Sequence, residues 1–98
     1  MNSSVLDNEP AATKVTVTPE HLLVELADGR GLRVPLAWYP RLQHGSESER
    51  QNCQLLGDGY AVEWPYLDEH IGIQSLLAGR RSGESEASLH RWLASRGK

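Results

Sequence analysis

The stretch HLLVELADGRGLRV, residues 21–34, decides how this chain begins to fold. Two apolar runs flank Asp28-Gly29, a dipeptide typical of β-hairpin turns. A two-residue turn would mix polar and apolar side chains on each face of the hairpin, whereas a three-residue loop would separate them. We therefore predict the loop Ala27-Asp28-Gly29, with Gly29 at a positive φ that glycine adopts without steric cost. The apolar face of this hairpin then consists of Leu22, Val24, Leu32 and Val34.

The segments on either side of the hairpin extend it. Residues 14–18 alternate polar and β-branched side chains, which predicts a third strand and a three-stranded antiparallel meander. Residues 36–42 favour a short helix after Pro35, with Trp38 and Leu42 facing inward. Ser46 and Glu49 then have the spacing of a capping box, which predicts a second short helix over about residues 47–52.

A second hairpin is predicted from residues 53–56 and 60–64. The pairing of Leu55 with Val62 favours a two-residue type I′ turn at Asp58-Gly59. Beyond this hairpin, Asp68 is predicted to cap the start of a short turn, and Gly79 to follow the end of a short helix. Residues 85–95 favour a last helix, on which three apolar side chains share one face: Leu89, Trp92 and Leu93.

These elements predict a small single-domain α+β protein. It comprises the three-stranded meander, two short helices, a second β-hairpin and C-terminal helices. We expect a flexible N-terminal arm at residues 1–13, the folded domain at residues 14–79, and a basic linker with an amphipathic helix at residues 80–98. The residues expected to form turns and caps are Ala27, Asp28, Gly29, Ser46, Glu49, Asp58, Gly59 and Gly79.

Composition limits the class of function. Ninety-eight residues form one domain, and the ten basic and thirteen acidic residues give a net charge of −3, which argues against a general nucleic-acid binder. The charge is uneven, because residues 80–98 carry only two acidic side chains. A solvated tail is the favoured interpretation, and an acidic or nucleic-acid partner is the alternative. The basic residues of this segment are Arg80, Arg81, Arg91, Arg96 and Lys98.

Two further features bear on location. The single cysteine, Cys53, cannot form an intramolecular disulfide, which favours a reducing, cytoplasmic compartment. Residues 1–13 lack the basic and apolar regions of a signal peptide. No apolar run approaches the roughly 20 residues that span a bilayer, so we expect no membrane association.

Ordered motifs along most of the chain carry a family resemblance. They are residues 21–30, Val34-Pro35-Leu36, residues 38–42, Gly57-Asp58-Gly59, Trp64-Pro65, residues 67–69, Ile71 and residues 76–79. Over about residues 14–80 the chain resembles the bacterial family named domain of unknown function 2442, or DUF2442.

The resemblance implies a compact α+β domain and two genetic contexts. Some family members look like an N-terminal module joined to a helix-turn-helix DNA-binding domain. Others are encoded beside small proteins in arrangements like toxin–antitoxin pairs. Only 19 residues follow Gly79 in this chain. We regard that as too few for a helix-turn-helix domain, which argues against direct DNA binding.

No motif in the sequence predicts catalysis. Asp68-Glu69-His70 could bind a metal or act as acid and base, but neighbouring residues of a regular element point in different directions, so a cap is favoured. The four histidines have no metal-ligand spacing, and Cys53 is interpreted as a buried thiol. Gly57-Asp58-Gly59 is a turn, since no Lys-Ser or Lys-Thr follows it. We expect no catalytic residue, no metal and no cofactor.

The candidate contact surface is aromatic and charged. Trp38, Tyr39 and Trp64 are expected mainly in the core, because the chain has no Phe. Interfaces are enriched in Trp, Tyr and Arg, so the exposed rim of this cluster together with Arg41 is the first candidate surface. Asp68 and Glu69 are assigned to the same candidate contact surface.

The leading hypothesis is a non-enzymatic interaction module with a protein partner or self-association, as one half of a small bacterial protein pair. A regulator that acts with nucleic acid, through residues 80–98 or through a DNA-binding partner, is the first alternative. A small-ligand-binding or accessory role is the second, located near Trp38, Trp64, Asp68 and Glu69.

Overall fold

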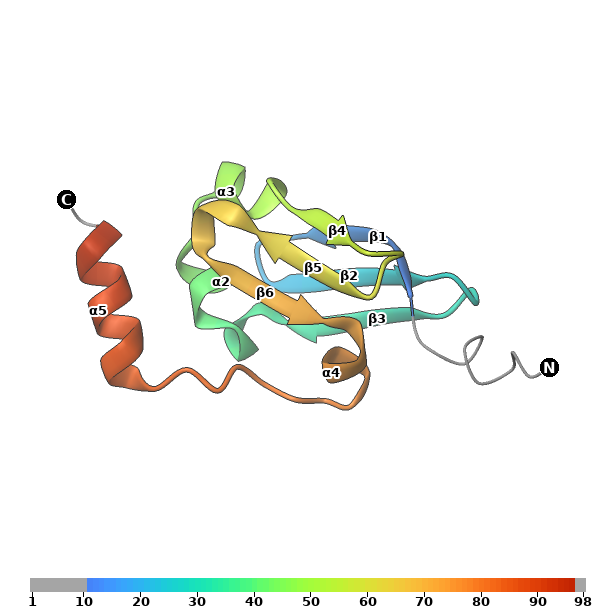
Figure 1. The fold of residues 1–98 in the computed structure, drawn as a ribbon. Coiled ribbons are helices and arrows are strands. Elements are labelled where there is room, and N and C mark those ends of the chain that lie inside the picture. Colours follow the sequence, from blue (N-terminus) through green and yellow to red (C-terminus); the bar gives the residue numbers. More distant parts are fainter. Residues whose placement is uncertain (1–10, 97–98) are drawn as a thin grey trace.

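The protein is built from two three-stranded antiparallel sheets that face each other (Figure 1). The structure, a computed structural model, describes residues 11–96. The first sheet has the order β1 (Ala12–Val17), β2 (His21–Leu26), β3 (Gly31–Pro35). The second has the order β4 (Gln54–Leu56), β5 (Ala61–Trp64), β6 (Glu69–Gly72). The α+β class and the N-terminal meander predicted from the sequence are confirmed.

The β2–β3 hairpin has the register that keeps its apolar side chains together. Leu22 pairs with Val34 and Val24 with Leu32. The Leu26 amide donates to the Arg30 carbonyl at 2.8 Å, so the loop contains three residues. Gly29 has φ +95°, and the Asp28 carboxylate accepts from the Arg30 amide at 3.0 Å. This amide holds the pKa of Asp28 below its ordinary value.

The first strand begins earlier than the sequence suggested. β1 starts at Ala12, which is 4% exposed, so Ala12 and Thr13 lie in the sheet and not in the N-terminal arm. The reason is a contact with the other sheet, because the Ala12 amide donates to the Gly59 carbonyl at 2.6 Å. Ala11 precedes the strand, and its carbonyl accepts from the Ala27 amide at 2.9 Å. Residues 1–10 of that predicted arm lie outside the described residues.

The predicted helix over residues 36–42 is divided into two pieces. They are the 3₁₀ turn η1 (Leu36–Trp38) and the helix α2 (Pro40–His44). The break falls at Tyr39, whose φ of −129° and ψ of 87° are not helical and precede a proline. Leu42 is fully buried, but Trp38 is only half-buried, and Tyr39 is the aromatic residue that enters the core.

The capping-box sequence starts α3 (Glu47–Gln51). The Ser46 hydroxyl accepts from the Glu49 amide at 3.2 Å, and the Glu49 carboxylate accepts from the Ser46 amide at 2.8 Å. Arg50 joins this helix to α2 by donating to the carbonyls of Leu42 and Gln43 at 2.8 and 2.7 Å.

The β4–β5 hairpin has the predicted pairing but another turn. Leu55 pairs with Val62, as expected. The loop, however, spans four residues, Gly57 to Tyr60, and is closed by the Tyr60 amide on the Leu56 carbonyl at 3.2 Å. A type I′ turn at Asp58-Gly59 is therefore wrong. Such a turn needs a positive φ at Asp58, whereas here the two glycines at positions 57 and 59 take that conformation.

The segment after β5 contains a strand that the sequence did not reveal. Pro65 ends β5 and begins the 3₁₀ turn η2 (Pro65–Leu67). Asp68 closes that turn with φ 51°, in the left-handed region, so it does not cap the start of a helix. β6 follows at once and pairs antiparallel with β5, with Ile71 opposite Val62.

The core lies between the two sheets. The inner face of the first sheet contributes Leu22 and Val24, and that of the second contributes Val62 and Trp64, all at most 1% exposed. The Trp64 indole N–H donates to the Arg50 carbonyl at 3.0 Å, so its polar atom is satisfied. The remaining core residues are Ala12, Val17, Leu26, Val34, Leu36, Tyr39, Leu42, Leu67, Ile71, Ile73 and Leu76.

Two helices complete the described chain. The helix α4 (Ile73–Leu77) ends in a Schellman motif, in which the Gly79 amide donates to the Leu76 carbonyl and the Arg80 amide to the Ser75 carbonyl. Gly79 has φ +76°. An extended linker, residues 80–85, leads to α5 (Glu86–Arg96) at one end of the molecule (Figure 1). No helix in the described part of the chain is long and apolar enough to span a bilayer.

Candidate functional site

Arg41 on α2 joins three segments that are far apart in the sequence. Its Nε and Nη2 atoms donate to both carboxylate oxygens of Glu84 in the linker, at 2.6–3.0 Å. Its Nη1 donates to the backbone carbonyl and the carboxylate of Asp68, at 3.0 and 3.1 Å. A bidentate arginine–carboxylate pair of this kind fixes both partners in one geometry. Arg41 therefore ties the linker to the start of β6.

The Glu84 carboxylate is the more buried member of the pair, because its side chain is 9% exposed. It also accepts from the Ser88 hydroxyl of α5 at 2.9 Å. The hydrogen bonds from Arg41 lower the pKa of Glu84 and raise that of Arg41. Glu84 is therefore charged at neutral pH, and removal of Arg41 would leave that charge without a cation partner.

The helix α5 packs on the body through a second ion pair. Arg96 donates to the two carboxylate oxygens of Glu49 at 2.7 and 3.1 Å. Two guanidinium groups lie over the Trp92 ring, that of Arg41 at 5.0 Å and that of Arg96 at 4.6 Å from its centre. Of the apolar face predicted for this helix, Trp92 therefore packs against the protein itself, although no residue of α5 is fully buried.

The docking of α5 is expected to weaken in acid. The hydrogen bonds from Arg96, with that from the Ser46 amide, lower the pKa of Glu49 from 4.5 to about 2. A lowered pKa means that the ionised carboxylate stabilises the folded state above pH 4.5 and that this contribution is lost as the pH falls toward 2. Amide hydrogen exchange in α5, measured at pH 6 and pH 3 and expressed as protection relative to the intrinsic rate at each pH, should therefore show weaker protection at pH 3.

The Glu49→Gln variant is the matched control, because glutamine also serves a capping box. This variant should be less protected than the native protein at pH 6, and the difference between the two proteins should be smaller at pH 3. An equal difference between the two proteins at both pH values would contradict the assigned role of the Glu49 carboxylate.

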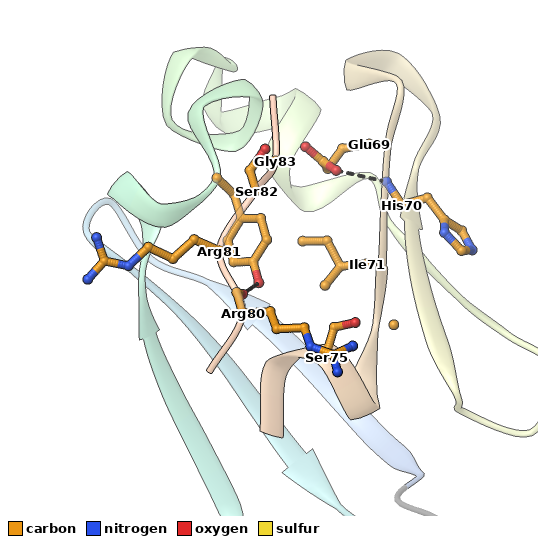
Figure 2. A pocket seen from close by; sticks show the side chains of 10 residues that line it. Glu69, His70, Ile71, Ser75, Arg80, Arg81, Ser82 and Gly83 are labelled. Carbon is orange, nitrogen blue, oxygen red and sulfur yellow. Dashed lines mark hydrogen bonds between the residues drawn. The ribbon is translucent and has the colours of Figure 1, made fainter. Parts of the chain in front are cut away.

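The free edge of β6 borders a cavity. Since the Ile73 amide donates to the Tyr60 carbonyl and bonded pairs alternate along an antiparallel ladder, the backbone N–H and C=O groups of His70 and Gly72 point away from β5. The linker runs beside this edge in the opposite direction, as Figure 2 shows. The space between them, which we name the β6 groove, measures about 240 Å³. Its lining residues are Tyr39, Glu69, His70, Ile71, Gly72, Ser75, Arg80, Arg81, Ser82 and Gly83.

The groove has an acidic end and a basic end. Glu69 lies at one end, whereas Arg80 lies beside Ser75 at the other (Figure 2). Burial raises the pKa of the Glu69 carboxyl. Its Oε2 accepts from the adjacent His70 amide at 3.2 Å, and no cation lies within 4 Å of it among residues 11–96. Glu69 is thus a half-buried carboxyl that can accept a further hydrogen bond.

Tyr39 and Trp38 hold the linker over the groove. The Tyr39 hydroxyl donates to the Arg80 carbonyl at 2.6 Å. The Ser82 amide donates to the Trp38 carbonyl at 3.0 Å, and the Arg81 guanidinium stacks 4.6 Å from the Trp38 ring. Burial and the Glu69 charge raise the pKa of Tyr39, which keeps the hydroxyl protonated as a donor.

A second cavity, of about 350 Å³, adjoins the first and shares Glu69, His70 and Ser82 with it. The Arg41–Glu84 pair and Asp68 line it, together with Ser88 of α5. Glu69 consequently stands between the two spaces.

The residues assigned to a contact surface from the sequence lie in three different places. Tyr39, Arg41, Asp68 and Glu69 gather around the β6 groove and the adjoining cavity. Trp64 is fully buried in the core and belongs to no surface. Trp38 lies half-buried behind the linker, against Arg81.

The histidines, the cysteine and the basic segment also have defined places. Within residues 11–96, no three side chains of His, Cys, Asp or Glu gather in a way that could hold a metal ion. Burial raises the pKa of the Cys53 thiol, which therefore stays protonated at neutral pH. Arg96 forms an ion pair with Glu49, which reduces the charge that the basic segment offers to nucleic acid, and Arg81 is stacked on Trp38. Lys98 lies outside the described residues.

Only Tyr39 and Glu69 among the residues that line the groove belong to the contact surface predicted from the sequence. Residues 80–83 were interpreted as linker, and Ser75 as part of a helix end, because neither carries a chemical motif. Arg80 and Arg81 are the signal that could have drawn attention to the segment, but their place beside β6 depends on contacts with Tyr39 and Trp38 that span about 40 residues of chain.

Comparison with known proteins agrees with this architecture. Residues 12–82, most of the chain, match the family described as "Protein of unknown function (DUF2442)". The chain belongs to the DUF2442 family. The matched DUF2442 region includes both sheets and ends within the groove-lining part of the linker, so α5 lies outside it. No curated protein matches the chain.

Two solved structures share the fold. A protein of unknown function from Rhodospirillum rubrum is 27% identical with a TM-score of 0.67, over 82% of this chain and 96% of that one. An uncharacterized protein from Chromobacterium violaceum is 17% identical with a TM-score of 0.68, over 90% of this chain and 83% of that one. The second likeness concerns the fold alone.

Proposed function

We propose that this DUF2442 domain is a non-enzymatic module that binds a protein partner. The observation that carries the proposal is the edge of β6, which pairs with no strand other than β5 within the described residues and borders a groove. Exposed strand edges are usually blocked in proteins that do not use them, because they readily pair with other chains. Here the linker that Tyr39, Trp38 and Arg41 hold lies beside the edge and forms no backbone hydrogen bond with it.

The family resemblance supports a finer form of the proposal. Some members of DUF2442 are encoded beside small proteins in arrangements like toxin–antitoxin pairs, so we propose that the partner is a small protein made together with this one. The charge pattern supports the same surface, because Arg80 is exposed at one end of the groove while Glu69 lies at the other.

Co-purification from the native host, with the size of the complex determined by mass photometry, tests this proposal. The native chain should elute with a stoichiometric partner. The Arg80→Glu variant should retain at least about tenfold less of it, because a charge reversal at the groove opposes complementary charges. The Tyr39 hydroxyl bonds the backbone of residue 80, so this variant keeps the linker contact.

Arg33→Glu is the matched control, since it makes the same charge change on an exposed residue of β3 that lines none of the described cavities. This variant should retain the partner. A native protein that is solitary at cellular concentration would disprove the proposal, and equal losses with both variants would disprove the assigned surface.

A further inference from the structure

We propose that the β6 groove receives an extended peptide segment, which adds to the second sheet as a fourth strand by pairing with the backbone of His70 and Gly72. This inference rests on the proposed function and names the kind of partner that the groove fits: an extended segment with a basic side chain toward Glu69 and an acidic one toward Arg80. Strand addition at a free sheet edge is an established form of peptide recognition.

The backbone geometry supplies the first argument. The outward N–H and C=O groups of His70 and Gly72 alternate with the inward-bonded groups of Ile71, as on any antiparallel edge. The linker forms no ladder with this edge, because its Ser82 amide donates to Trp38 and its Arg80 carbonyl accepts from Tyr39. A strand placed along β6 would therefore meet two carbonyl acceptors and the Gly72 N–H at the standard spacing, and it would compete with the Glu69 carboxylate for the His70 N–H.

The other sheet edges in the described chain are less suited to an added strand. Along β3, the outward positions are Gly31, Arg33 and Pro35, and proline has no N–H. Along β1, the Val17 carbonyl already accepts from Gln51 at 3.0 Å, and the Ala12 amide is bonded to Gly59. β4 has only three residues. The edge of β6 is the one that combines outward backbone groups with a groove.

The side chains of the groove supply the chemistry of the segment. In an extended segment, alternate side chains point to the same face. A segment that pairs with β6 would direct one such face toward Tyr39 and Ile71, both less than 5% exposed and therefore a closed floor. The charged ends at Glu69 and Arg80 complement a basic residue at one end and an acidic residue at the other.

The size of the groove also favours a segment that passes through it. Its volume of about 240 Å³ is below the roughly 300–1,000 Å³ of pockets that enclose drug-sized ligands. A chain that enters and leaves at the open ends needs only its backbone and short side chains within this space.

Position 72 provides a variant that removes one donor from this edge. Gly72 has φ −77° and ψ 141°, which proline can adopt, and Ile71 before it is in a strand, as a residue before proline should be. Gly72→Pro deletes the outward N–H alone, since that group has no role within the β5–β6 ladder. Gly72→Ala is the matched control, because it keeps the N–H and its Cβ would lie 3.8 Å from the Ser75 hydroxyl, an ordinary contact.

The probe is a random heptapeptide library displayed on phage, selected against the full-length native protein. Enriched peptides, synthesised with blocked ends, are then measured against both variants by isothermal titration calorimetry. We expect peptides that carry a basic and an acidic residue. Gly72→Pro should weaken their binding at least about tenfold, whereas Gly72→Ala should change it less than about threefold. Both variants should melt no lower than the native protein.

A second arm tests the charge at Glu69. The Glu69→Gln variant should lose the preference for a basic residue while it still binds through the edge. Peptides that bind Gly72→Pro as well as the native protein, or a selection that yields none, would overturn the inference. The proposed function is tested separately. If Gly72→Pro retains a cellular partner, the proposal of an interaction module is unaffected and only the strand-addition site is disproved.

Discussion

The Gly59→Ala substitution is expected to lower the free energy of unfolding more than a glycine-to-alanine substitution at any other surface loop of the protein. A Cβ at this position would overlap the carbonyl oxygen of Ala12 and come within 3.0 Å of its amide nitrogen. The φ of +96° adds a further cost for any residue with a side chain. Steric overlap with backbone and a left-handed conformation together should cost roughly 3 kcal/mol or more. Urea unfolding followed by circular dichroism measures this change in the free energy of unfolding.

Gly29→Ala is the control for the conformational part of that cost. Gly29 has nearly the same φ, +95°, but a Cβ there would have no heavy atom within 4 Å. Its loss should be limited to about 1–2 kcal/mol. Equal losses at positions 29 and 59 would show that the contact between Ala12 and Gly59 does not hold the two sheets together.

Trp64→Ala is expected to cost about 3–5 kcal/mol, the range for removal of a large buried aromatic side chain. Trp64 is fully buried, and its loss would also leave the Arg50 carbonyl without its donor. A domain of this size is stable by only about 5–15 kcal/mol. The variant should therefore melt more than about 10 °C lower than the native protein, as differential scanning calorimetry would show.

Tyr66→Ala, two residues away, is the comparison that separates core from surface. Tyr66 is 66% exposed, and removal of such a side chain should change the free energy of unfolding by less than about 0.5 kcal/mol. A Trp64→Ala variant that keeps its stability but fails to bind a partner would restore Trp64 to a contact surface and contradict its assignment to the core.

Local rules were sufficient where contacts are close in sequence. The apolar side chains of β2 and β3 agree with only one register, and this register gave the three-residue loop with Gly29. Ser46 and Glu49 are three residues apart, so the capping box is also a local pattern. In both cases the hydrogen bonds that define the structure join residues that are close in sequence, across one loop or within one helical turn.

Contacts between distant segments explain what the sequence did not reveal. β6 has only four residues, and two of them, Glu69 and Gly72, are poor strand formers, so pairing with β5 decides its structure. The start of β1 at Ala12 depends in the same way on Gly59, 47 residues later. Neither pairing leaves a periodic pattern in the sequence.

The candidate site was only partly predictable for the same reason. Arg41, Asp68 and Glu69 were singled out by residue type, and they do lie together. Glu84 received no attention, because one glutamate in a polar segment carries no signal. Its importance comes from burial beside Arg41, which only the folded chain creates.

The linker over the β6 groove has both of its ends secured before any partner arrives. Tyr39 holds the carbonyl of Arg80 at one end, and Arg41 holds the carboxylate of Glu84 at the other. Ordering a free segment on binding reduces affinity, because each immobilised side chain costs about 0.5–1.5 kcal/mol of conformational entropy. In this protein that entropy is already lost during folding. The groove is preorganised, and a partner has to order only itself.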